Sequence, residues 1–120
     1  MSLNHVHLAA SDVPALERFD ASWFGFRRTA AHGDAVFLRD EAGFLIVAEP
    51  RPPAAPLPAW FHLGFCVDSA NEVRERYERM KRAGVPMAKD LIDDEGEATV
   101  FYCLDPGGTK VEVSWYASDD

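Results

Sequence analysis

The feature that most constrains the fold of this chain is an internal repeat. Residues 4–12 (NHVHLAASD) reappear in outline as residues 61–69 (FHLGFCVDS), so that His5 and His62 hold the same place in the two copies, 57 residues apart. In each copy an alternating strand leads into an amphipathic helix, and three short apolar stretches follow. A repeat of this length predicts two copies of one supersecondary unit. We expect each copy to be a βαβββ module.

Local signals set the limits of these elements. Asp12 and Ser69 are predicted to begin the two helices, and Ser69 with Glu72 forms an S-x-x-E capping box. Gly25 and Gly84 are predicted to end the helices. The stretches that should form the remaining strands are residues 26–30, 35–39 and 44–48 in the first copy and 86–92, 99–104 and 110–116 in the second.

These elements divide the chain into a first module over residues 1–50, a proline-rich connector over residues 51–58 and a second module over residues 59–120. Proline cannot donate to a strand ladder, so the connector should be extended and stiff. Neither module is long enough to bury a sufficient core alone. The modules must therefore pack together or across a dimer. We expect one α+β domain, in which they form a cupped mixed β-sheet with the helices on its outer face.

Charge and hydropathy exclude several classes of function. The 120 residues carry a formal net charge of −8, which opposes the counterion release that drives nucleic-acid binding. No apolar run approaches the ~20 residues of a membrane helix, and the N-terminus does not read as a secretory signal. We expect no nucleic-acid partner, no membrane partner and a cytoplasmic location. Cys66 and Cys103 should then be reduced thiols that pack as small hydrophobes.

Strand alternation places three potential metal ligands on one face. Successive side chains of a strand point to opposite faces, so His5, His62 and Glu112 should project away from the apolar face that the helices cover. Two imidazoles and one carboxylate suit a divalent transition metal that keeps open positions for water or substrate. A single histidine in a strand is more often a half-exposed polar residue than a ligand. The coincidence of these residues at equivalent repeat positions is what favours a site.

Four segments, in this order and at this spacing, resemble the vicinal oxygen chelate superfamily. They are residues 4–8 (NHVHL), 23–26 (WFGF), 61–65 (FHLGF) and 104–113 (LDPGGTKVEV). That superfamily includes glyoxalase I, extradiol dioxygenases, methylmalonyl-CoA epimerase, fosfomycin thiol transferases and metal-free bleomycin-resistance proteins. All are built from paired βαβββ modules around a cupped sheet, and the resemblance covers the whole chain.

The resemblance implies that His5, His62 and Glu112 are ligands of a divalent metal, which would be Mn, Fe, Zn, Ni or Co. A fourth ligand position of the family falls near Ile46 or Val47, and neither side chain can ligate. The implied ligand set therefore differs from the four protein ligands of glyoxalase I. It matches that of extradiol dioxygenases and of fosfomycin transferases, and the short members of the latter type are closest to this chain in layout.

Four further residues are candidates for contact with a substrate. His7, which stands where fosfomycin transferases carry a phosphonate-binding threonine, is a candidate acid or base, or else a polar residue that lines a wet cavity. Tyr102 is a candidate catalytic hydrogen-bond donor and substrate contact, or an amphipathic filler. Trp60 is either a stacking surface for the substrate or an anchor of a dimer contact, and Cys66 is a soft substrate contact or a small buried thiol.

The sequence therefore favours a metal-dependent lyase, isomerase, transferase or dioxygenase of this superfamily. Its small substrate would chelate the metal through two vicinal oxygens. We also expect a homodimer with shared active sites, in which His5 comes from one subunit and His62 with Glu112 from the other. The alternative is a metal-free protein of the bleomycin-resistance type that sequesters a drug or another ligand. That alternative gives no reason for the three ligand types to coincide.

Overall fold

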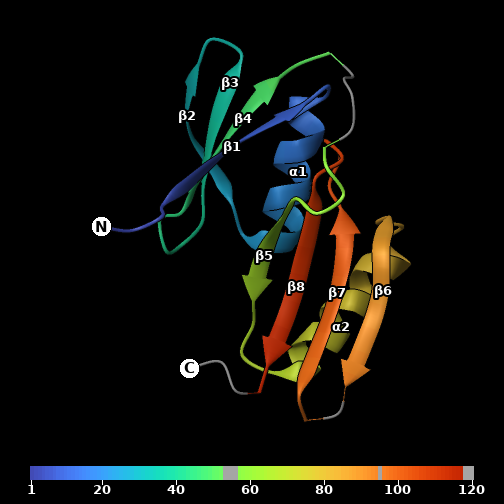
Figure 1. Ribbon diagram of the computed structural model, residues 1–120. Helices are drawn as coiled ribbons and strands as arrows, with labels where there is room; N and C mark the ends of the chain where they lie inside the picture. The colour runs from blue at the N-terminus through green and yellow to red at the C-terminus, as the bar shows by residue number, and fades with distance from the viewer. Residues whose placement is uncertain (53–56, 95, 118–120) are drawn as a thin grey trace. The chain divides into compact units, whose positions relative to one another are not determined.

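Two units of the same topology make up the chain in the computed structural model, which describes residues 1–52, 57–94 and 96–117 (Figure 1). The first unit is Met1–Pro56 with Pro106–Gly108, and the second is Leu57–Asp105 with Thr109–Asp120. Each unit contains the element order βαβββ and its own four-stranded mixed sheet. The expected α+β fold of two βαβββ modules is confirmed. Part of the predicted connector, residues 53–56, lies outside the described residues.

The first unit is a sheet with one helix packed on it. Its elements are β1 (His5–Ala10), α1 (Val13–Phe24), β2 (Arg27–His32), β3 (Ala35–Arg39) and β4 (Leu45–Pro50). The strand order is β1-β4-β3-β2, and the β1–β4 pair is parallel while the others are antiparallel. Alternate residues of the strands meet one stripe of α1, and the resulting core contains Leu8, Ala10, Val13, Leu16, Phe19, Val36, Leu38, Ile46 and Ala48.

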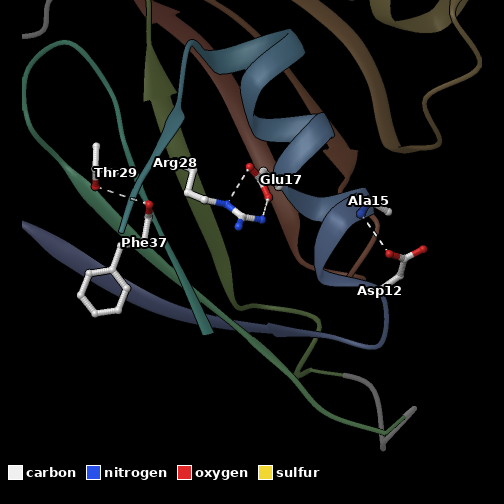
Figure 2. Close-up of polar contacts among 6 residues, drawn as sticks. All are labelled: Asp12, Ala15, Glu17, Arg28, Thr29 and Phe37. Carbon is white, nitrogen blue, oxygen red and sulfur yellow. Dashed lines mark hydrogen bonds and ion pairs between the residues drawn. The ribbon is translucent and has the colours of Figure 1, made fainter. Parts of the chain in front are cut away.

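Both ends of α1 follow from local chemistry. The Asp12 carboxylate accepts a hydrogen bond from the Ala15 amide at 3.0 Å, as Figure 2 shows, and so satisfies an amide in the first turn. Gly25 ends the helix at φ 73°, a left-handed conformation that glycine adopts at little cost. The same figure shows how β2 is fixed to the helix, because the Arg28 guanidinium donates to the Glu17 carboxylate at 2.6 Å.

The second unit repeats this arrangement. Its elements are β5 (His62–Cys66), α2 (Ala70–Arg82), β6 (Met87–Asp94), β7 (Ala98–Leu104) and β8 (Lys110–Tyr116), in the strand order β5-β8-β7-β6. Ser69 caps α2 by accepting a hydrogen bond from the Glu72 amide at 3.1 Å. The helix packs on one face of the sheet, and the buried side chains there include Val73, Tyr77, Met80, Phe101, Cys103, Val111 and Val113.

The opposite face of each sheet carries the polar positions that alternation predicts. His5 and His7 are exposed while Leu8 and Ala10 are buried. In β5 the exposed residues are His62, Gly64 and Cys66, so Cys66 is not the packed thiol that we expected from composition. Its parity in the strand turns the thiol away from α2. Among the described residues, no helix has the length and apolar character needed to cross a membrane.

Candidate metal-binding site

The structure brings two of the three predicted ligands together in the second unit. Strands β5 and β8 run parallel as neighbours, with Gly64 opposite Glu112. Across these two strands, the His62 Nε2 atom lies 3.2 Å from the Glu112 Oε1 atom. The Glu112 side chain is only 12% exposed. The result is an imidazole and a largely buried carboxylate side by side on the face opposite α2.

The two ring nitrogens of His62 have different partners. The Nδ1 atom lies 3.1 Å from the carbonyl oxygen of Trp60, which can only accept, so Nδ1 carries the proton. In the neutral ring, Nε2 then presents its lone pair to the Glu112 carboxylate. Two lone-pair donors 3.2 Å apart need a proton or a cation between them. The same spacing fits two ligands that each lie about 2.1 Å from one first-row metal ion.

Two tyrosines complete the surroundings of Glu112. The Tyr116 hydroxyl donates to Glu112 Oε2 at 3.1 Å, and the His62 ring meets the Tyr102 ring edge-on with centroids 5.4 Å apart. Burial, and then hydrogen bonding and charge at Glu112, raise the pKa of Tyr102 to about 12. The same causes raise the pKa of Tyr116. At neutral pH both hydroxyls are therefore proton donors and not bases.

A cavity of about 270 Å³ opens beside this pair. Its lining residues are Trp60, His62, Ala88, Lys89, Tyr102 and Lys110. The predicted substrate contacts Trp60 and Tyr102 therefore lie on one cavity with His62. Cys66 does not line it, and its sulfur lies 3.8 Å from the Ser114 hydroxyl. Sequence reasoning missed the two lysines.

In the first unit, His5 has the same bonding pattern as His62. Its Nδ1 atom lies 2.7 Å from the Asn4 side-chain oxygen, to which it donates, and Nε2 is left with a lone pair. His7 differs, because its Nε2 atom donates to Glu49 Oε2 at 2.5 Å. Sequence reasoning missed both Asn4 and Glu49. The signal for Glu49 was present, since it continues the alternation of Leu45 and Val47 in β4.

The register shows what the first unit has in place of Glu112. In the second unit, the residue two positions after His62 is Gly64, which pairs with Glu112. In the first unit, the residue two positions after His5 is His7, which pairs with Val47. Val47 is thus the counterpart of Glu112, and its side chain has no donor atom. Within each unit, the described residues contain no group of three or more His, Cys, Asp or Glu side chains arranged to hold a metal ion.

Comparison with known families agrees with this organisation. The model of the Glyoxalase/Bleomycin resistance protein/Dioxygenase superfamily matches residues 2–113. The chain belongs to this superfamily. The resemblance drawn from the four sequence segments is thereby confirmed. A search of curated proteins finds no match.

Solved structures of this superfamily share the fold over nearly the whole chain. A possible glyoxalase from Bacillus cereus is 28% identical with a TM-score of 0.80, and the match covers 94% of this chain and 97% of that one. Lactoylglutathione lyase from Agrobacterium tumefaciens is 25% identical with a TM-score of 0.71, with 95% and 92% covered. The chain is thus similar to proteins that include an enzyme.

A third similar structure contains a metal. It is a mutant of the fosfomycin resistance protein FosX from Listeria monocytogenes, complexed with Mn(II) and 1S,2S-dihydroxypropylphosphonic acid. Its identity is 24%, its TM-score is 0.79, and the match covers 98% of this chain and 90% of that one. At this identity the likeness concerns the fold. A protein of the same fold thus binds Mn(II) in that structure.

Proposed function

We propose that this protein is a metal-dependent enzyme whose small substrate binds through two vicinal oxygens to a divalent metal held by His5, His62 and Glu112. The observation that carries the proposal is the His62–Glu112 pair, in which the Nε2 and Oε1 atoms lie 3.2 Å apart. Because neither unit alone holds three such ligands among its described residues, the site would combine His5 of one unit with the pair of the other. We propose that this combination forms in a homodimer.

The metal, when bound, would act as a Lewis acid or redox centre toward the two oxygens. The chain's own residues have separate roles. The Trp60 carbonyl and the Asn4 side chain hold the Nδ1 protons of His62 and His5 and so keep each Nε2 atom available. The Tyr102 hydroxyl, with its pKa raised to about 12, would donate a hydrogen bond to a substrate oxygen. His7, held at Nε2 by Glu49, would accept or return a proton.

The proposal is tested by metal content. We expect about one transition metal per chain in tag-free protein purified without chelator, measured by elemental mass spectrometry. His62→Ala and Glu112→Gln should lose the metal while the circular dichroism spectrum is unchanged. His32→Ala is the matched control, because this exposed histidine packs on Phe37 and not on the site. Stoichiometric metal in Glu112→Gln would refute the ligand assignment.

A second candidate function is sequestration of a ligand without metal or chemistry. The observation that favours it is Trp60, which is 76% exposed on the rim of the cavity. An exposed tryptophan beside a cavity is a binding surface whether or not a metal is present. Absence of metal after reconstitution with Mn, Fe, Zn, Ni and Co would make this the leading function.

A further inference from the structure

Two of the three lysines in the chain line the cavity of the second unit. They are Lys89 and Lys110, while the third, Lys81, pairs with Asp90 at 2.9 Å. In the part of the chain that the structure describes, neither cavity lysine forms an ion pair. The Lys110 ammonium donates one hydrogen bond, to the Ala59 carbonyl, and lies 5.6 Å from the centroid of the Tyr102 ring. An ammonium has three donors, so donors remain for a ligand.

The strand register fixes these cations beside the candidate metal ligands. Glu112 of β8 pairs with Tyr102 of β7, and Tyr102 pairs with Lys89 of β6. Residues in such a row are lateral neighbours on one face of the sheet. Lys110 pairs with His62 in the next row. The two lysines therefore flank Tyr102 and His62.

The carboxylates near the cavity have partners other than Lys89 and Lys110. Asp90 follows Lys89 in β6 but accepts hydrogen bonds from Tyr77 and Lys81 of α2. Asp93 accepts from Arg74 of the same helix at 2.7 Å. Glu112 does not line the cavity, and its two carboxylate oxygens face the His62 ring and the Tyr116 hydroxyl. In a chain of net charge −8, this cavity thus has a local excess of positive charge.

Besides the two lysines and His62, the lining consists of two aromatic side chains and Ala88. Trp60, 76% exposed, and the Tyr102 ring provide aromatic surfaces. The volume of about 270 Å³ is slightly below the roughly 300–1,000 Å³ of cavities that take drug-sized ligands, which indicates a small ligand. We propose that this cavity binds a small aromatic carboxylate, with its anionic group on Lys89 and Lys110 and its ring against Trp60. The inference rests on the proposed function in one respect, that the bound carboxylate is the substrate.

The test is an NMR titration of isotope-labelled, metal-free protein with benzoate, its neutral analogue benzamide, and acetate. Benzoate should bind at least about tenfold more tightly than benzamide, because charge-assisted hydrogen bonds are the stronger ones. Lys89→Met and Lys110→Met should each weaken benzoate about tenfold. Lys81→Met, which removes the same charge from the same unit, should leave its affinity unchanged. Trp60→Ala should weaken benzoate and leave acetate unaffected.

Three results would overturn the inference: equal affinity for benzoate and benzamide, equal effects of all three lysine substitutions, or no shifts at millimolar benzoate. Metal content is measured separately on the same preparations. A chain that binds metal but not benzoate loses this inference and retains the proposed function. A chain that binds benzoate but no metal retains the anion site and loses the proposed function.

Discussion

Burial distinguishes the two thiols of this chain at the scale of single residues. Cys103 is fully buried on the α2 side of β7, and burial, with a smaller effect of Asp105, raises its pKa to about 12. Cys66 is exposed near the Ser114 hydroxyl. Only the thiolate is an efficient nucleophile, so a buried thiol of high pKa is inert.

We therefore expect one fast thiol per folded chain when the protein is treated with a chromogenic disulfide reagent at about pH 8. Cys66→Ser should remove this reaction, and denaturant should release the second thiol in both proteins. Two fast thiols in the folded wild type would show that β7 opens far more readily than its burial indicates.

Residue-level prediction from sequence succeeded where simple alternation holds. His62 and Glu112 lie on one face because β5 and β8 are regular over those positions. Lys89 could not be placed in this way, since the pairing of β6 with β7 shifts register between Met87 and Lys89 and again before Ile92. A bulge reverses the parity that alternation assumes. The hydrogen bonds at Nδ1 of His5 and His62 depend on side-chain geometry that no sequence pattern gives.

At the scale of elements, the start of α1 depends on one side chain. Asp12→Ala should lower the free energy of unfolding by about 1 kcal/mol, because the Ala15 amide loses its acceptor. Asp12→Asn should retain most of the stability, since an amide oxygen also accepts. Urea denaturation measures both, with Ser11→Ala as the neighbouring exposed control. A loss as large in Ser11→Ala would mean that the cap is not the cause.

Helix limits were predictable because capping residues set them, whereas β2 and β6 each begin one residue later and end two residues later than predicted. Strands 35–39 and 110–116 were predicted with the bounds that β3 and β8 have. The prediction for β4 was wrong at its end, since the strand continues past Ala48 to Pro50. Pro50 is tolerated there because it lies at the strand terminus, opposite Ala10 of β1 and beyond the last residue paired with β3. This extension is what brings Glu49 to His7.

At the scale of the whole molecule, the proposed sharing of sites between subunits can be tested by complementation. Light scattering should give twice the 13.3 kDa chain mass. His5→Ala and Glu112→Gln chains, each unable to bind metal, should regain about one quarter of the wild-type metal per chain when refolded as an equal mixture, because half of the dimers are mixed and each has one intact site. If each site forms within one chain, the mixture recovers no metal. A monomeric mass would remove the dimer proposal.

The register that makes Val47 the counterpart of Glu112 has a consequence for how such a centre can change over time. Any valine codon becomes a glutamate or an aspartate codon when the base at its second position changes from T to A. A site with one carboxylate and a site with two are thus one point mutation apart in this chain, without any rearrangement of the backbone. An added carboxylate would cancel one more charge of a divalent ion. Substitution at position 47 would therefore change the charge of the metal centre, and with it the substrates that the centre can bind.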